Sequence, residues 1–144
     1  MPRLEFEDDV KASAKTIYDI LLNGDEYEVK WNLTVNELIS IGPNKWEVKS
    51  TIGDLTSTRV EEVENERISL DIEGSIFTKM GYILKPKDDL CHILLWGEFE
   101  NEKHKKILTS AGNMLLESLK RFVEFMEEGG DPESFDKRAL TITP

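Results

Sequence analysis

The order of the chain's segments constrains its fold more than any single motif. A strand-like segment at 4–10 is followed by a helical segment at 14–22 and by a second short one that ends near Trp31. Strand and turn patterns then continue to residue 100, and an amphipathic helix is predicted over 102–128. A single helix does not fill the space that a large curved sheet encloses. The order therefore predicts an internal cavity, and a cavity suggests a ligand.

Each strand is predicted from alternation, or from apolar residues between turn residues. Leu4 and Phe6 alternate with Glu5 and Glu7, which is typical of a half-buried strand. Short connectors rich in Gly, Asn and Asp separate the later strands, so neighbouring strands are expected to be antiparallel. Together with 4–10, the predicted strands cover 33–41, 45–52, 55–64, 67–73, 77–84 and 90–100.

Polar residues mark the ends of the two short helices. Ser13 is a typical N-cap for the first helix. Asn23 and Gly24 are expected to end that helix, because both tolerate a left-handed conformation. Asp25 can then cap the second helix.

The long helix carries apolar residues at spacings of three and four, which place them on one stripe. Gly129 and Gly130 are expected to end it. We expect a ligand-binding domain over 1–130 and a C-terminal tail over 131–144 that could pack on the sheet. Its apolar residues 139–142 could add a strand or cover an apolar patch. The stripe consists of Ile107 or Leu108, Ala111, Leu115, Leu119, Phe122 and Met126.

Composition and charge exclude several classes of protein. The chain has 144 residues and a net charge of -11, from 29 acidic and 18 basic residues. Such a charge repels phosphate groups, so neither a nucleic-acid partner nor an anionic membrane surface is expected. No apolar run is long enough to span a bilayer, and the acidic N-terminus does not resemble a signal peptide, so a cytoplasmic protein is expected. The single cysteine, Cys91, is expected to be a packed thiol.

The opening residues carry a resemblance to a known superfamily. Residues 10–21, Val-Lys-Ala-Ser-Ala-Lys-Thr-Ile-Tyr-Asp-Ile-Leu, combine an apolar strand end, an Ala-Ser pair and a helix with an aromatic residue. Tyr27 and Trp31 follow as an aromatic pair. In this pattern and in its order of elements, the chain resembles the helix-grip (SRPBCC) superfamily. This superfamily includes START lipid-transfer domains, the major birch pollen allergen, polyketide cyclases and a group of proteins associated with carbon monoxide dehydrogenase.

The resemblance implies both a fold and a mode of binding. The implied fold is α+β, with a seven-stranded antiparallel sheet wrapped around a long C-terminal helix and two short helices after the first strand. The superfamily implies that an apolar small molecule occupies the cavity. Only some of its members are enzymes, and the motifs that carry the resemblance mark no reaction.

The turn at 74–76 predicts which residues line the cavity. It pairs Leu70 with Met80 and Ile68 with Tyr82. Continuing this register places alternate residues of the last strand on the same face. The expected cavity wall is Trp46, Ile68, Leu70, Met80, Tyr82, His92, Leu94, Trp96 and Leu115.

The same register turns the other apolar residues of the last strand outward. These residues are Cys91, Ile93, Leu95 and Phe99. An apolar outer face needs cover, which the C-terminal tail or a second subunit could supply, so a homodimer is one expectation.

Few polar residues are candidates for chemistry. His92, Tyr82 and Arg59 could act as acid-base or oxyanion-binding groups. A lone histidine in a strand is more often structural, however, and Tyr82 could merely pack. Arg59 and Glu61 are expected on a solvated outer face, while one interpretation of the turn at 65–66 directs them inward. There is no metal-ligand spacing, no phosphate-binding loop and no nucleophile-base pattern, so no metal, cofactor or catalytic residue is predicted.

Three hypotheses about function follow from these patterns. The first is binding of a hydrophobic or amphipathic small molecule, such as a lipid, an isoprenoid or an aromatic metabolite. The second is a cyclase-like or dehydratase-like enzyme that uses the same cavity. The third is an acidic interaction protein with a filled core. An apolar cavity would favour the first, convergent ionisable groups the second, and a close-packed interior the third.

Overall fold

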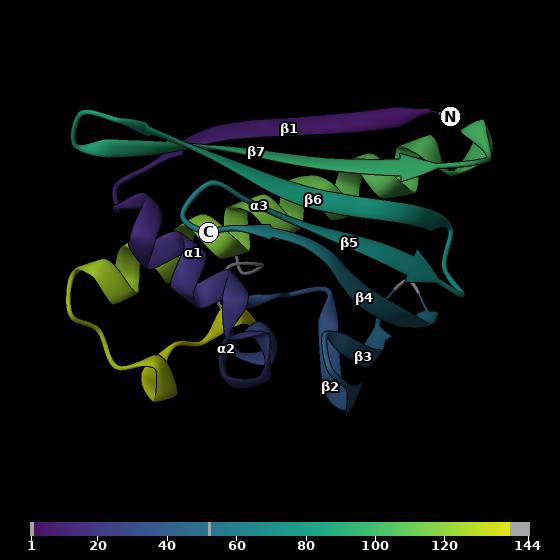
Figure 1. Cartoon of the computed structure of the whole chain (residues 1–144), viewed down its shortest axis with the longest axis horizontal. Helices are drawn as coiled ribbons and strands as arrows, with labels where there is room; N and C mark the ends of the chain where they lie inside the picture. The colour runs from purple at the N-terminus through teal and green to yellow at the C-terminus, as the bar shows by residue number, and fades with distance from the viewer. Residues whose placement is uncertain (1, 52, 139–144) are drawn as a thin grey trace.

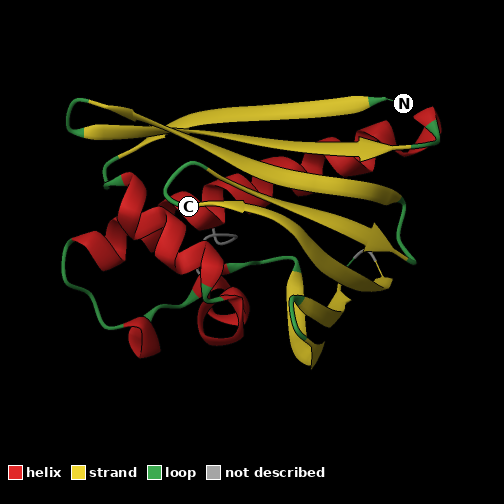
Figure 2. Cartoon of the chain, viewed as in Figure 1, coloured by secondary structure: helices red, strands yellow, loops and turns green. Residues whose placement is uncertain are grey.

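Seven antiparallel strands form one curved sheet in the described part of the chain. The computed structural model describes residues 2–51 and 53–138. The strand order is β1-β7-β6-β5-β4-β3-β2, so β1 and β2 are the two edges (Figures 1 and 2). The strands are β1 (Arg3–Val10), β2 (Val35–Gly42), β3 (Lys45–Ser50), β4 (Gly53–Val63), β5 (Arg67–Glu73), β6 (Phe77–Lys87) and β7 (Leu90–Phe99).

The helices of the described residues lie where the element order predicts them. α1 (Ala14–Leu22) and α2 (Gly24–Trp31) follow β1, and α3 (Lys105–Glu127) follows β7. Figure 1 shows α3 running along the face that the sheet curves around, with α1 and α2 gathered near one end. The predicted α+β helix-grip architecture is therefore confirmed. None of these helices combines the length and the apolar character needed to cross a membrane.

The junction between α1 and α2 differs in detail from the prediction. Ser13 caps α1 as expected, since its hydroxyl accepts a hydrogen bond of 3.1 Å from the Thr16 amide. Asn23 ends the helix at a negative φ of -94°, and its side-chain amide donates to the Asp19 carbonyl. No left-handed residue is needed, because α2 begins at once. Asp25 does not cap α2 but accepts a hydrogen bond of 2.6 Å from Trp46 Nε1.

The predicted register is right for β5 and β6 and wrong for β7. Leu70 pairs with Met80 and Ile68 with Tyr82, as predicted. The predicted register places Tyr82 on the same face as His92, Leu94 and Trp96. In the structure, however, Tyr82 pairs with Leu95. The strands are joined by a two-residue turn, with Lys87 opposite Leu90, which shifts β7 by one residue.

This one-residue shift exchanges the two faces of β7. His92, Leu94 and Trp96 lie on the outer face of the sheet, opposite to the predicted side. The residues expected to be outward instead belong to the interior and are at most 4% exposed: Cys91, Ile93, Leu95 and Phe99. The outer face of β7 therefore carries Leu94 and Trp96 beside His92, and not the four residues for which a cover was expected.

Two clusters of buried apolar residues make up the core. The larger one lies between α1, α3 and the central strands, and includes Ile17, Leu119 and Phe122. The smaller one lies where β2 to β5 curl and includes Trp46 and Ile72. Leu70 and Met80 are partly buried and pack against both clusters. The core is thus divided at the middle of the sheet.

α3 presents the predicted stripe to the sheet and comes very close to β1. Leu108, Leu119 and Phe122 are buried, whereas Ile107 is 51% exposed. At Gly112 the Phe6 ring lies so near the helix that an added Cβ would be 2.3 Å from it. α3 ends at Glu127, and Gly129 follows its C-cap with a φ of 89°, the left-handed conformation expected after the end of a helix.

The described part of the tail packs mainly on helices and touches the sheet only at the start of β2. The Phe135 ring lies 5.0 Å from that of Phe122 in α3 and 5.2 Å from that of Phe125. Lys137 Nζ donates to the backbone carbonyls of Val29, Asn32 and Val35 at 2.6–3.0 Å. Residues 139–142, for which a strand or a cover was considered, lie outside the described residues.

Candidate functional site

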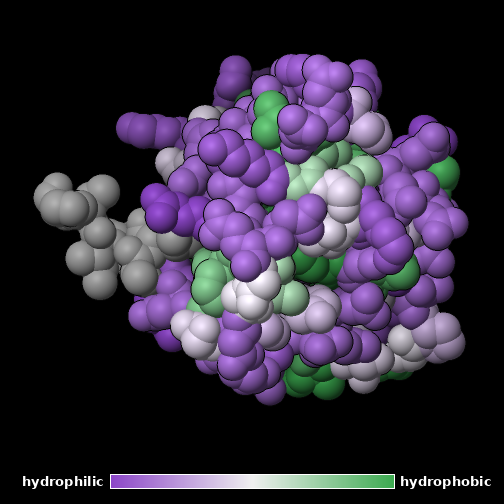
Figure 3. Space-filling model, turned by 90° about the vertical axis from the view of Figure 1, so that its left-hand side faces the viewer, coloured by the Kyte–Doolittle hydropathy of each residue, from purple (hydrophilic) through white to green (hydrophobic). Residues whose placement is uncertain are grey.

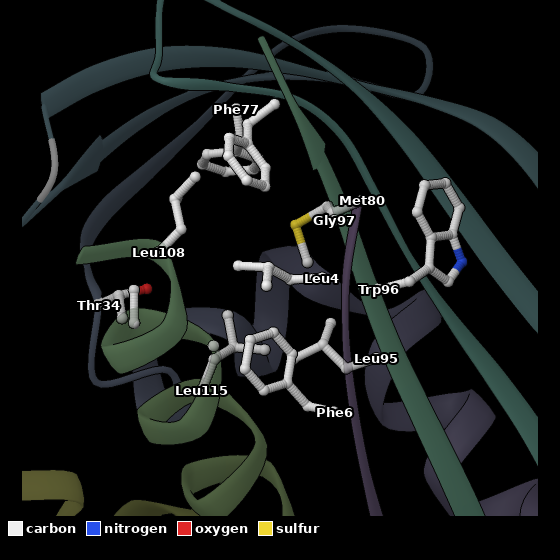
Figure 4. Close-up of a pocket in the computed structure, with 13 residues that line it drawn as sticks. Leu4, Phe6, Thr34, Phe77, Met80, Leu95, Trp96, Gly97, Leu108 and Leu115 are labelled. Atoms are coloured by element: carbon white, nitrogen blue, oxygen red, sulfur yellow. The ribbon is translucent and has the colours of Figure 1, made fainter. Parts of the chain in front are cut away.

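A cavity lies between the first half of α3 and the end of the sheet where β1 begins and β7 ends. Its volume is about 80 Å³, several times the roughly 10–15 Å³ that one water molecule needs. Figure 4 shows the side chains that surround it. They are Leu4, Phe6, Thr34, Phe77, Met80, Leu95, Trp96, Gly97, Phe99, Leu108, Ala111, Gly112 and Leu115.

The lining is apolar apart from one hydroxyl group. Among the described lining residues, none has an acidic or basic side chain. Thr34 supplies the side-chain oxygen, and Figure 4 shows that oxygen directed toward the other lining side chains, beside Leu108 and Leu115. Such a site can hold an apolar molecule and one polar group, but it has no residue that could transfer a proton.

The structure brings three of the nine predicted wall residues to the cavity. Met80 and Leu115 line it with their side chains, as Figure 4 shows. Trp96 is also a lining residue, but its indole points away from the cavity. The ring lies on the outer face of the sheet over Gly81, with the Arg3 guanidinium 4.5 Å from the ring centroid.

The other six predicted wall residues lie elsewhere. Ile68 and Tyr82 are on the inner face and belong to the larger core cluster, while Leu70 packs against both clusters. Trp46 belongs to the smaller cluster. The remaining two, His92 and Leu94, are on the outer face because of the register shift.

Several lining residues were not predicted as wall residues. Leu4 and Phe6 were recognised as the buried side of a strand, and that alternation was the signal that could have placed them at the cavity. Leu95 and Phe99 were assigned to the wrong face. Thr34 had no sequence signal as a cavity residue. It was included in the strand predicted over 33–41, whereas β2 begins at Val35 and leaves Thr34 in the connector after α2.

A bulge in β4 separates Arg59 from Glu61. Arg59 pairs with Leu70 and points inward, whereas Glu61 pairs with Ser69, because Val60 is an extra residue between them. The Arg59 guanidinium donates to the Leu22 carbonyl at 2.9 Å and lies 4.9 Å from the centroid of the Trp46 ring. The inward alternative is therefore correct for Arg59, which joins β4 to α1.

Glu28 on α2 is a carboxylic acid whose pKa is strongly raised in the folded protein. Burial away from water raises the pKa of its carboxyl to about 7, although Asn32, Lys137 and Arg59 favour the charged form. Its Oε2 lies 3.4 Å from the Asn32 side-chain nitrogen. Burial also raises the pKa of Tyr82 well above its usual value, with the charge of Glu28 adding to the effect. Glu28 is not a lining residue of the cavity.

His92 on β7 connects this strand to β1 at the outer face of the sheet. Its ring nitrogens lie 2.9 Å from Glu7 Oε1 and 2.8 Å from Asp9 Oδ1 on β1. The hydrogen bonds to Glu7 and Asp9 raise the pKa of His92, and the bond to His92, with a further one to Lys87, lowers the pKa of Asp9. Within residues 2–51 and 53–138, no three His, Cys, Asp or Glu side chains come together as a metal site.

Comparisons with known proteins identify the fold but not a closely related sequence. No family model matches the chain, and no curated protein matches it. Solved structures do match over most of its length. The Aha1 dimer from Colwellia psychrerythraea has a TM-score of 0.69 at 16% identity, covering 86% of this chain and 97% of that one.

Two further structures show the same arrangement. A START superfamily protein from Mycobacterium smegmatis has a TM-score of 0.63 at 18% identity, covering 88% of this chain and 97% of that one. The protein XoxI from Bacillus cereus has a TM-score of 0.71 at 10% identity, covering 91% and 100%. At these identities the likeness shows the fold alone, and that fold is the one shared by Aha1 and START-superfamily structures.

Proposed function

We propose that this chain, whose fold is that of START-superfamily structures, binds a hydrophobic or amphipathic small molecule in the cavity under α3. The observation that carries the proposal is the lining of apolar side chains with one hydroxyl. Burial would supply most of the affinity, at about 25 cal/mol per Å² of apolar area. A lipid, an isoprenoid and an aromatic metabolite all fit this chemistry, and the small volume favours a slender chain or a single ring.

Catalysis of the cyclase or dehydratase kind is a second candidate function. Its support is the inner-face position of Arg59 and Tyr82 and the raised pKa of Glu28. A ligand that extended beyond Thr34 toward Glu28 would approach these groups. The third hypothesis, an interaction protein with a filled core, has less support because the interior is divided and leaves a cavity.

Binding of a neutral fluorescent probe tests the proposal. 4-(Dimethylamino)benzonitrile, a neutral single-ring fluorophore whose emission depends on polarity, should bind the native protein at a defined stoichiometry. Its affinity should be insensitive to salt because burial and not charge drives binding. Ala111→Leu should fill the cavity from α3 and weaken probe binding at least tenfold. Its stability should change little, because Leu is a good helix former and empty space receives the added atoms.

Ser110→Leu is the matched control. Ser110 is exposed on the same helix and does not line the cavity, so its replacement should leave the affinity unchanged. Absence of saturable probe binding would contradict the proposal. A loss of about 1–3 kcal/mol of stability in Ala111→Leu would also contradict it, because that is the cost of overpacking a filled core.

The setting of this function is part of the proposal. We propose a domain over 1–130 that holds the ligand, with residues 131–144 as an accessory tail. A cytoplasmic location is supported by the unpaired buried thiol of Cys91. A homodimer is supported by the dimeric state of the Aha1 protein from Colwellia psychrerythraea.

A further inference from the structure

The Thr34 hydroxyl at the cavity has its own proton committed elsewhere. Thr34 Oγ1 lies 2.7 Å from Asn32 Oδ1, and the Thr34 backbone nitrogen lies 3.0 Å from the same oxygen. A backbone N–H is only a donor, so the Asn32 atom that it contacts must be the carbonyl oxygen of the amide. That oxygen cannot donate, and the Thr34 hydroxyl must therefore donate its proton to it.

The neighbours of Asn32 hold this arrangement in place. Asn32 is only 3% exposed. Its side-chain nitrogen faces Glu28 Oε2, and its backbone carbonyl accepts hydrogen bonds from Lys137 Nζ and from the Val35 amide. Rotating the amide by 180° would place its NH₂ group against the Thr34 N–H and leave two donors facing each other. The hydrogen bonds of Asn32 thus fix the direction in which the Thr34 hydroxyl donates its proton.

The geometry points to a preference for ligands that donate a hydrogen bond to Thr34. With its proton engaged, Thr34 Oγ1 offers only lone pairs to the cavity, and no described residue donates to it. We propose that the site selects an alcohol or phenol over an ether, aldehyde or carboxylate of the same size. This inference rests on the proposed function, because it specifies the polar end of the same ligand. The net charge of -11 acts in the same direction, since it disfavours a carboxylate.

A pair of isomers tests this inference. 1-Octanol and 1-methoxyheptane have the same atoms, but only the alcohol has a donor. Their dissociation constants should be measured by displacement of the bound probe from wild type, Thr34→Val and Thr34→Ser. Valine keeps the shape of threonine without the hydroxyl, and the backbone bond to Asn32 remains. The ratio of ether to alcohol dissociation constants cancels the difference in hydration of the two ligands when variants are compared.

We expect the ratio to fall about threefold to tenfold in Thr34→Val, which corresponds to one hydrogen bond, and to stay at the wild-type value in Thr34→Ser. An unchanged ratio in Thr34→Val, with both ligands still bound, would overturn the inference and leave the proposed function intact. Failure of both ligands and of the probe to bind would overturn both. If Thr34→Val does not fold, Thr34→Ala gives the same comparison.

Discussion

Burial raises the pKa of Glu28, which distinguishes this carboxyl from the acids at the surface. Glu28 belongs to α2 and has cationic groups near its carboxyl, yet desolvation outweighs them and the pKa rises from 4.5 to about 7. In the folded protein the Glu28 carboxyl is therefore about half protonated at a pH near 7. The consequence is a pH dependence of stability that a polar but uncharged side chain should remove.

Glu28→Gln is expected to stabilise the protein at alkaline pH. The folded-state pKa lies above the unfolded one, so the stability linked to this proton is complete below pH 4.5 and is lost as the pH rises to about 7. Removing the charge should recover up to about 3 kcal/mol at pH 8 and nothing at pH 4. Chemical unfolding of both proteins at each pH measures the difference. Equal stabilities at pH 8 would show that the carboxyl is solvated.

His92 also makes the stability fall as the pH rises. The prediction for Glu28 is therefore stated as a difference in stability between the variant and the wild type. Its raised pKa means that stability is present below pH 6.5 and is lost as the pH rises through the folded-state value. A variant at Glu28 leaves this slope in place. His92→Gln would isolate it.

Single residues were the hardest part of the site to predict. Thr34 is a cavity residue only because α2 ends three residues before it and β2 begins one residue after it. Arg59 faces inward because one extra residue in β4 reverses the alternation. Trp96 faces outward because the turn between β6 and β7 has only two residues. Each outcome depends on the length of a connector or on one extra residue in a strand, which composition and periodicity do not reveal.

At the level of elements, the two halves of α3 have different surroundings. Its first half borders the cavity through Ala111 and Leu115, and its second half is fully packed, with Leu119, Phe122 and Val123 at 0% exposure. One helix therefore borders the cavity with its first half and completes the close-packed core with its second half. The two halves should respond differently to the same kind of substitution.

Leu119→Ala is expected to cost about 2–5 kcal/mol of stability, because it removes buried contacts and leaves a void. Met114→Ala on the exposed side of the same helix is the control, since Met114 is 42% exposed, and should cost less than about 1 kcal/mol. Urea unfolding of both variants measures the costs. Similar small losses for the two would show that the second half of α3 is not close-packed.

The elements themselves were largely predictable. α1 begins and ends as predicted, because a capping serine, an apolar stripe and polar end residues agree with one another. β5 was also predicted over its observed length, since turn residues flank it on both sides. The cavity wall was predicted only in part, because it depends on how strands are aligned and not on where they lie in the sequence.

For the whole molecule, the excess of acidic groups is a source of repulsion. Figure 3 shows a mainly hydrophilic surface at the end of the molecule near α1, with apolar areas that are small and separate. Ion pairs such as Lys15–Asp19 at 2.7 Å are exposed and contribute little. With a net charge of -11, repulsion within the folded chain should exceed the attraction within such pairs.

The melting temperature is therefore expected to rise when sodium chloride increases from about 0.01 to about 0.3 M. Salt shortens the screening length from about 30 Å to below 10 Å and weakens long-range repulsion most. Thermal unfolding followed by circular dichroism measures the change, with sucrose of equal osmolality as the uncharged control. A melting temperature that falls with salt would mean that the surface ion pairs dominate.

The hydrogen bonds of Lys137 connect the tail to the part of the chain that carries Thr34. Its ammonium group holds the carbonyls of Val29, Asn32 and Val35, which lie on both sides of that threonine. The tail and residues 29–35 should therefore open as one cooperative unit in hydrogen exchange, although more than a hundred residues separate them. A protease that cleaved the chain near residue 131 would then lower ligand affinity without touching the cavity.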